Sequence, residues 1–338
     1  MIAAPSGYPG PGRDGVAGTR HAAVRALPRS RAASRPLASA TAAAVLACAL
    51  APSASAGPAG FAFLEVPAGA RASALGGAYA SIASGVEAVY WNPAGLDAAR
   101  GTQITASHFE LYSGLRHDQF AIAGHLLGGG VAAALRALYS EPIEERDELG
   151  NLTGSFGAHD LEFAIGYGCA VRPGLRAGGT VQAVRERLAN LAVTTYAMGL
   201  GASWEPAFWP GSRWSLSTHN LGPSRSYVID GAKGTPVDLP AAVQGGVSYG
   251  RVVAQGMNLK GALESRFTRG RNGVAMLGGE LGSPVGAALR LGLRVNDSSA
   301  NFSVGAGYAM SALHLDYAFV PSRLDLGDTH RFSVTTQF

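Results

Sequence analysis

Alternating apolar and polar residues recur from about residue 101 to the end of the chain, in segments broken by Gly, Pro, Asn and Asp. Because successive side chains of a β-strand point to opposite faces, each segment is predicted to be a strand with one apolar face. The predicted strands are residues 102–111, 117–127, 130–140, 157–171, 174–186, 192–205, 212–222, 239–249, 251–267, 271–281, 284–295, 300–309, 310–321 and 329–338. An even number of such segments is typical of a transmembrane β-barrel. The predicted fold class is therefore an all-β transmembrane barrel of 14 antiparallel strands, formed by residues 101–338.

The last predicted strand ends the chain on an aromatic residue. Phe332, Val334, Thr336 and Phe338 fall on one face of this strand, and polar residues fall on the other. This ending resembles the last strand of bacterial outer-membrane barrels, in which the terminal aromatic residue is part of the signal read by the barrel assembly machinery. The resemblance implies that Phe338 is an assembly signal and that the chain resides in the bacterial outer membrane.

Charged residues on the polar faces are predicted to point into the barrel, because a Lys or Arg facing the middle of the bilayer costs roughly 2–4 kcal/mol. These predicted lumen-facing charges are Arg136, Arg176, Arg185, Arg290, Arg294, Arg331, Glu162, Glu264 and Asp316. If the lumen is a channel, the excess of arginine favours anionic head groups. Alternatively, the charges pair with one another and stiffen the wall. A soluble β-sandwich would show the same alternation, but Tyr and Trp near the predicted strand ends favour a membrane interface.

The N-terminal residues have the features of an export signal. Six arginines precede an apolar run at residues 37–51, and the small residues Ala54-Ser55-Ala56 follow it, which predicts a signal peptide over residues 1–56. Processing as a lipoprotein at Cys48 is the alternative. Cleavage after Ala56 would leave 21 basic and 22 acidic residues and a single cysteine, Cys169. That composition gives no support for nucleic-acid binding and excludes an internal disulfide in the mature chain.

Residues 57–100 differ from the rest of the chain because they are rich in small residues and show no strand alternation. They form either an extension outside the barrel or a short helical hatch folded into its lumen. Two blocks stand out, from Gly69 to Tyr79 and from Trp91 to Leu96. The residues singled out in these blocks are Gly69, Arg71, Gly76, Gly77, Tyr79, Trp91, Asn92, Pro93 and Gly95. Pro93 lacks a backbone donor and restricts Asn92, so this pair is predicted to shape a turn where the hatch meets the wall.

These two blocks resemble the PorV/PorQ family, which is related to the FadL-type transporters of long-chain fatty acids. The segments 315–319 and 325–333 resemble the closing hairpin of the same family. The resemblance implies a 14-stranded barrel with an N-terminal hatch. PorV-like relatives carry or hold secreted proteins for the type IX secretion system, and this non-enzymatic role is our main functional expectation.

The alternative implied by the resemblance is a FadL-like passive channel for hydrophobic small molecules. The hatch segment, residues 57–100, is too short for the plug of an energy-coupled transporter, which favours passive passage or binding. The expected partners are outer-membrane lipid, the assembly machinery, and either secreted proteins or a hydrophobic ligand, with a monomeric barrel and no nucleic acid.

Two long connections, Ser140 to Gly157 and Pro223 to Leu239, are predicted to be extracellular loops. The first is acidic but lacks the residue order of a dedicated Ca²⁺ loop, which favours a solvated loop. The segment Gly246 to Gly250 matches the Gly-x-Ser-x-Gly pattern of serine hydrolases at Ser248. That chemistry requires a strand-to-helix turn, and an alternating strand is predicted here instead. Histidines are scattered, so no catalytic residue, metal or cofactor is predicted.

Overall fold

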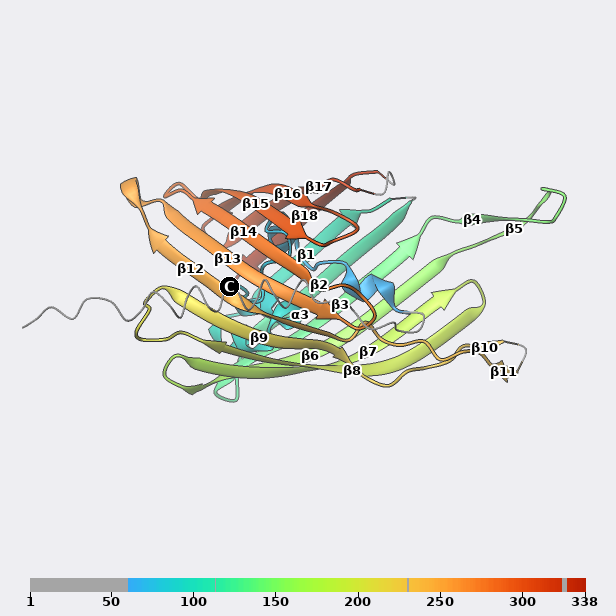
Figure 1. Ribbon diagram of the computed structural model, residues 1–338, viewed down its shortest axis with the longest axis horizontal. Coiled ribbons are helices and arrows are strands. Elements are labelled where there is room, and N and C mark those ends of the chain that lie inside the picture. Colours follow the sequence, from blue (N-terminus) through green and yellow to red (C-terminus); the bar gives the residue numbers. More distant parts are fainter. Residues whose placement is uncertain (1–59, 113, 230, 324–326) are drawn as a thin grey trace, which may run out of the picture.

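The computed structural model describes residues 60–112, 114–229, 231–323 and 327–338 (Figure 1). Fourteen strands form a closed barrel in which all neighbouring strands are antiparallel, and β1 closes the barrel against β18. The barrel strands are β1 (Gln103–Glu110), β2 (Leu115–Leu126), β3 (Gly129–Ser140), β6 (Ala158–Arg172), β7 (Leu175–Leu188), β8 (Leu191–Trp204), β9 (Ser212–Leu221), β12 (Ala242–Val252), β13 (Asn258–Thr268), β14 (Val274–Gly282), β15 (Ala287–Val295), β16 (Phe302–Met310), β17 (Leu313–Val320) and β18 (Thr329–Gln337). The predicted fold class is confirmed.

The alternation seen in the sequence separates an outer apolar face from an inner face. On β6, Leu161, Phe163 and Ile165 are exposed on the outside, while Glu162 and Ala164 are buried inside. The same holds for β18, where Phe332 points outward and Arg331 is buried. Lipid therefore meets a continuous apolar surface, as expected for a barrel in a membrane.

The strand boundary that differs most from the prediction is the start of β13. The strand predicted over 251–267 begins only at Asn258, because β12 continues to Val252 and a turn follows it. This turn contains Gln255 and Gly256 with positive φ angles of 58° and 76°, which end both strands. Val253 therefore lies in the turn and not on the apolar face of β13.

The two ends of the barrel differ. At one end, which we call the hairpin end, the two predicted loops contain two-stranded sheets, β4 (Ile143–Arg146) with β5 (Leu152–Phe156) and β10 (Val228–Ile229) with β11 (Ala232–Lys233). Both project beyond the barrel (Figure 1). The opposite end, the terminal end, carries Phe338 and turns as short as 127–128 and 311–312. Short periplasmic turns and longer extracellular loops are the usual arrangement in outer-membrane barrels.

The N-terminal segment fills the lumen as a hatch of short helices. These are η1 (Ala62–Glu65), α2 (Ala70–Ala74), η2 (Gly85–Glu87), α3 (Ala88–Trp91) and η3 (Pro93–Ala98). The hatch starts at the hairpin end, where the Gly60 amide donates to the carbonyl of Asp238. It leaves at the terminal end, where Thr102 exchanges backbone hydrogen bonds with Phe338. Most hatch side chains are buried, including Leu75, Tyr79 and Leu96.

The predicted signal peptide, residues 1–56, and the alternative processing site at Cys48 lie outside the described residues. In the part of the chain that is described, no helix is long and apolar enough to cross a membrane.

Candidate functional site

The hatch contacts the barrel wall at positions where glycine is present in both the hatch and the wall strand. Gly76 and Gly77 have positive φ angles of 67° and 80°, which glycine adopts without strain. Opposite them on β15, a Cβ atom on Gly292 would lie 2.1 Å from the Gly76 amide nitrogen. Glycine is therefore required on both sides of this contact.

The second block of the hatch is seated in the same way against the other side of the barrel. Asn92 caps η3 by accepting from the Ala94 amide, and its side-chain amide donates to the carbonyl of Ala202 on β8 over 3.1 Å. A Cβ atom on Gly178 of β7 would lie 2.5 Å from the Pro93 carbonyl. Asn92 is buried and bonds both hatch and wall, so it belongs to the hatch–wall contact as well as to the turn.

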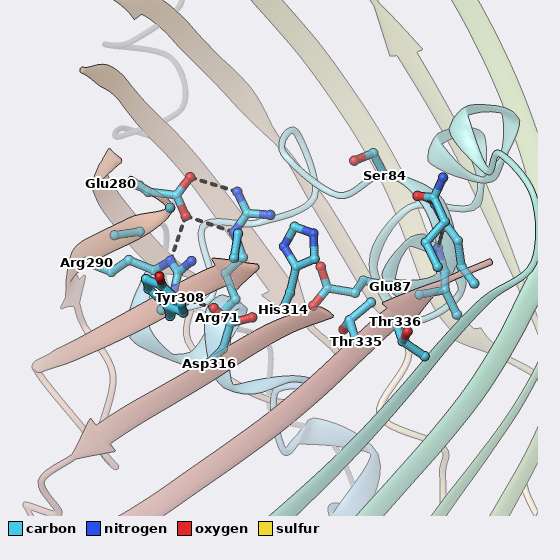
Figure 2. Close-up of a pocket in the computed structure, with 17 residues that line it drawn as sticks. Arg71, Ser84, Glu87, Glu280, Arg290, Tyr308, His314, Asp316, Thr335 and Thr336 are labelled. Atoms are coloured by element: carbon cyan, nitrogen blue, oxygen red, sulfur yellow. Dashed lines mark hydrogen bonds and ion pairs between the residues drawn. The ribbon is translucent and has the colours of Figure 1, made fainter. Parts of the chain in front are cut away.

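A chain of ion pairs joins α2 to the wall near the terminal end (Figure 2). Glu280 on β14 accepts from Arg71 of the hatch at 2.7 Å and from Arg290 of β15 at 2.6 Å. Arg290 also pairs with Asp316 on β17 at 2.7 Å. Glu280 was not among the predicted lumen charges, although alternation along β14 places it on the face opposite the exposed Leu277 and Leu281.

A polar cavity of about 330 Å³ lies beside this chain of ion pairs, between the hatch and strands β14 to β18 and β1. Glu87 of the hatch borders the cavity, and its carboxylate accepts from the Tyr79 hydroxyl over 2.6 Å. Burial raises the pKa of the Glu87 carboxyl, and the Arg71 charge and the Tyr79 hydrogen bond partly oppose this increase. The terminal end of the lumen is therefore polar and held by charge.

Glu264 anchors the middle of the hatch. Its carboxylate accepts from the backbone amides of Ala80 and Ser81, from the Ser81 hydroxyl and from the Gln244 amide. Ser248, the residue of the Gly-x-Ser-x-Gly match, lies within β12 and donates to the Ser81 carbonyl over 3.0 Å. No strand-to-helix turn exposes this serine, so its hydroxyl serves the hatch–wall contact.

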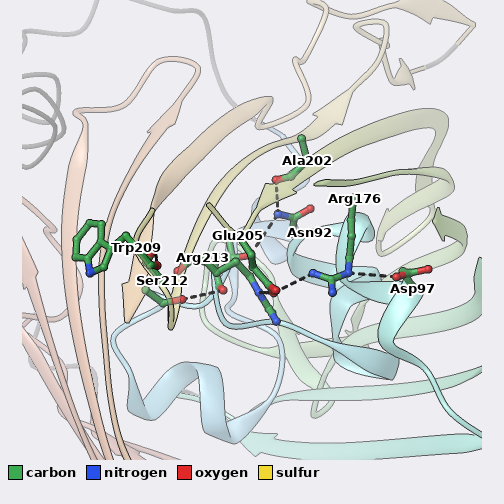
Figure 3. A network of polar contacts seen from close by, with 11 residues as sticks. Asn92, Asp97, Arg176, Ala202, Glu205, Trp209, Ser212 and Arg213 are labelled. Carbon is green, nitrogen blue, oxygen red and sulfur yellow. Dashed lines mark hydrogen bonds and ion pairs between the residues drawn. The ribbon is translucent and has the colours of Figure 1, made fainter. Parts of the chain in front are cut away.

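A third polar network lies on the opposite side of the lumen (Figure 3). Arg176 at the start of β7 pairs with Asp97 of the hatch at 3.1 Å and with Glu205 at 2.9 Å. Glu205 also pairs with Arg213 of β9 at 2.8 Å. Although burial acts to raise the Glu205 pKa, the two arginines lower it on balance. Neither Asp97 nor Glu205 was predicted as a partner.

The remaining inward charges also have partners. Arg136 is in ion contact with Glu162 at 2.6 Å, and both are buried. Arg294 donates to the Gly76 carbonyl and pairs with Asp297, and Arg331 donates to the Ser73 hydroxyl. The ion pairs agree with the alternative in which lumen charges stiffen the wall. Arg331, however, bonds only hydroxyl groups, and among the described residues no ion pair is formed by Lys260 or Arg266, which also face inward on β13.

The prediction for Arg185 is wrong, because its side chain lies on the outer face of β7. Val181 is exposed on the same face, whereas Thr180, Gln182 and Val184 are buried inside. Arg176 and Arg185 are nine positions apart on one strand, and side chains alternate at every residue. Both residues therefore cannot point into the lumen.

An apolar cluster at the hairpin end of the lumen was not predicted. It consists of the buried residues Phe61, Phe63, Leu64, Leu138, Val184, Val193, Ala197 and Leu239. Beside it, β8 pairs with β9 only between Met198 and Trp204 among the described residues, although β8 itself begins at Leu191. The register shifts near Asn220, which has a positive φ of 55°. The barrel ladder therefore stops next to an apolar part of the lumen.

Within the described residues, no three His, Cys, Asp or Glu side chains are grouped so that they could hold a metal ion. In the acidic loop, Asp147 accepts from the Leu149 and Asn151 amides and Glu144 pairs with Arg146. These carboxylates bond within their own loop.

Comparison with known proteins identifies the fold. No protein-family model matches the sequence, and neither does any curated protein. Among solved structures, the chain is similar to the CymD monoaromatic hydrocarbon channel, with a TM-score of 0.56 and 13% identity over 80% of this chain and 97% of that one. It is similar to the Pseudomonas putida toluene transporter TodX, with a TM-score of 0.55 and 14% identity over 79% and 96% of the two chains. A Pseudomonas aeruginosa FadL homologue has a TM-score of 0.53 and 11% identity over 80% and 98%.

These three structures share the architecture of FadL-family outer-membrane barrels, and the predicted location in the bacterial outer membrane agrees with them. CymD is described as a channel and TodX as a transporter. None of the comparisons supports the PorV/PorQ family specifically.

Proposed function

We propose that this barrel lets small hydrophobic molecules pass passively across the outer membrane. This reverses our order of expectation, because the structural neighbours favour a FadL-like channel over the PorV/PorQ role. The observation that carries the proposal is the apolar cluster around Phe63 and Leu239, located where the β8–β9 ladder stops. An apolar solute would leave water for this cluster, gaining about 25 cal/mol per Å² of buried apolar surface.

The hatch is the barrier along this route. It occupies the lumen between the apolar cluster at the hairpin end and the polar cavity at the terminal end. Its contacts with the wall are apolar packing, ion pairs, hydrogen bonds and close glycine contacts, so the hatch can shift without breaking a covalent bond. We infer that passage requires such a local shift.

A reversible cross-link tests both the passage and the shift. A Cβ atom on Gly278 of β14 would lie 3.3 Å from the Cβ of Ala78 in the hatch, close to the ~3.5–4.5 Å that a disulfide spans. It would also lie 2.9 Å from the Leu75 carbonyl oxygen, so the Gly278→Cys single variant measures the effect of this crowding by itself. We would combine Ala78→Cys and Gly278→Cys with Cys169→Ser and express this variant in a host outer membrane. Cellular uptake of the fluorescent apolar probe N-phenyl-1-naphthylamine is the measurement.

We expect the native barrel to accelerate probe uptake, the oxidised variant to lose that acceleration, and a reductant to restore it. Single-cysteine variants control for the substitutions themselves. Uptake unchanged by the native barrel would overturn the proposed passage. Uptake equal in the oxidised and reduced double variant would leave passage intact and overturn the need for a hatch shift.

A second candidate function is the secretion-linked role, in which the barrel holds an exported protein at the cell surface. Its support is the sequence resemblance together with the two hairpins, β4–β5 and β10–β11, that project from the hairpin end. Deleting residues 143–156 separates the two roles. Loss of surface retention of secreted proteins with unchanged probe uptake would favour the secretion role, and unchanged retention would argue against it.

A further inference from the structure

The outer surface of the barrel carries a basic pocket that no lumen function uses. A cavity of about 340 Å³ lies over β3, β6 and β7 near the hairpin end. Its outward-facing lining residues are Ala137, Tyr139, His159, Leu161, Arg185 and Arg187. The strand register places His159 opposite Arg187 and Leu161 opposite Arg185, so three neighbouring strands build one surface.

The arginines of this pocket lack carboxylate partners. No described carboxylate lies within ion-pair distance of Arg185 or Arg187, and Arg187 uses only its Nε to donate to the Ala189 carbonyl. Asp160 also borders the cavity, but its side chain is on the lumen side of β6 and accepts a hydrogen bond from the Arg187 backbone amide. The nearby outward acids already have partners, since Asp118 bonds His108 and Tyr139 and Glu141 pairs with Arg116. The pocket therefore presents net positive charge.

The height of the pocket indicates what it meets. The exposed apolar stripe of β6 runs from Val171 to Leu161. At about 3.3 Å per residue and a tilt of about 40°, this stripe is about 25 Å tall, the usual height of the lipid-facing band. Arg185 lies level with Leu161 at the hairpin-end edge of this stripe, and His159 and Arg187 lie just beyond it, at the level of lipid head groups. Leu161 and Phe163 continue the same surface into the acyl-chain region.

We propose that this pocket binds the phosphate of a phosphorylated lipid in the outer leaflet, with the acyl chains lying along the β6 stripe. Arginine forms charge-assisted, frequently bidentate hydrogen bonds with phosphate oxygens. Two arginines two positions apart on one strand point the same way and are about 7 Å apart, so both can reach one head group. This site is independent of what passes through the lumen.

The test measures lipid retention on the whole barrel. The purified barrel in detergent is titrated with bisphosphorylated lipid A, with the same lipid after removal of its phosphates, and with inorganic phosphate, and bound lipid is counted by native mass spectrometry. The test variant is Arg185→Gln with Arg187→Gln. The matched control is Arg172→Gln with Arg251→Gln, which removes two exposed arginines at the terminal end.

We expect the native barrel and the control to retain the phosphorylated lipid at least about tenfold better than the test variant, given two charge-assisted contacts. The dephosphorylated lipid should bind all three proteins alike. Equal retention of the phosphorylated lipid by all three would overturn the proposal. So would equal retention of the phosphorylated and dephosphorylated lipid by the native barrel together with binding of inorganic phosphate that the test variant loses, which would indicate a free-phosphate site. Heat-modifiable migration on gels verifies that each variant is folded.

Discussion

At the hairpin end the hatch packs against the wall with large apolar side chains, beside polar contacts such as the Phe61 amide donating to Glu186, whereas at the terminal end charges and bare backbone make the contact. Phe61, Phe63 and Leu64 pack against Val184 and Leu239 at the first end. At the second end, Arg71 is held by Glu280, and this contact lies in a network of partly buried ion pairs with Arg290 and Asp316.

The difference indicates that one end of the hatch can repack while the other end is held in a fixed geometry. Apolar contacts are non-directional, so side chains at the hairpin end can repack around a hydrophobic guest. Ion pairs and close glycine contacts depend on exact geometry, and losing one partner leaves a buried charge behind. We therefore assign the adaptable part of the hatch to the hairpin end. At the terminal end the ion pairs of Glu280 with Arg71 and Arg290 fix the hatch in place, and we call them the latch.

Glu280→Leu should give the largest effect, because it breaks the latch. The substitution leaves Arg71 and Arg290 without their shared carboxylate, and losing one partner of a buried pair costs about 3–5 kcal/mol. We expect the lower end of that range, because Arg71 and Glu280 are partly exposed and Arg290 keeps Asp316. The free energy of unfolding in urea and protease cleavage of the hatch are the measurements. Glu141→Gln, at an exposed pair with Arg116, serves as the control and should cost about 1 kcal/mol or less. Equal costs for the two variants would contradict the latch.

Gly292→Ala should come next, because it pushes the hatch off β15. The added Cβ would lie 2.1 Å from the Gly76 amide nitrogen, and neither backbone can move away cheaply. Overpacking of this kind costs about 1–3 kcal/mol, and we expect the upper part of that range. Gly279→Ala on β14 is the matched control, since its Cβ would meet nothing within 4 Å. If urea unfolding cannot distinguish the two variants, the hatch does not sit as closely as the structure shows.

Leu239→Ala should have a smaller effect on stability but a visible effect on passage. Leu239 is fully buried in the apolar cluster, where such a truncation costs about 2–5 kcal/mol. We expect about 2 kcal/mol, because neighbouring side chains at an open end can relax into the space. Probe uptake should rise, since the adaptable region is loosened. The exposed Leu149→Ala is the control, and reduced uptake in Leu239→Ala would place the route elsewhere.

The sequence was sufficient to predict the barrel because each strand has one face toward lipid and one toward the lumen. Apolar and polar residues therefore alternate along each strand, and this pattern is local. The same rule, applied strictly, would have placed Arg185 outside. What alternation cannot supply is register, and the partnership of Glu280 with Arg290 depends on how β14 pairs with β15. The apolar cluster is harder still, because Phe61 and Leu239 meet only once the chain has closed around its own N-terminal segment. Contacts of this kind leave no local pattern.

The smallest predicted effect is a pH dependence at the rim, where the adaptable end of the hatch begins. Glu65 of η1 pairs with Arg271 at 2.5 Å. Burial raises the Glu65 pKa above its usual 4.5, and the Arg271 charge only partly opposes this. The folded protein therefore holds the Glu65 proton more tightly than the unfolded chain does. This contribution to stability is complete below about pH 4.5 and is lost as the pH rises through the folded-state pKa.

Glu65→Gln removes the titrating proton, so the difference in unfolding free energy between the native barrel and this variant should shrink or reverse as the pH rises from 4 to 8. We expect a change of about 0.5 kcal/mol, in the range of partly exposed pairs. Arg271→Gln removes the charge that opposes the shift, so the pH dependence should become larger and move to higher pH. A difference that is flat or grows with pH would show that the Arg271 pairing, rather than burial, governs Glu65. The hairpin end would then be held by charge as the terminal end is, and the contrast between the two ends would be lost.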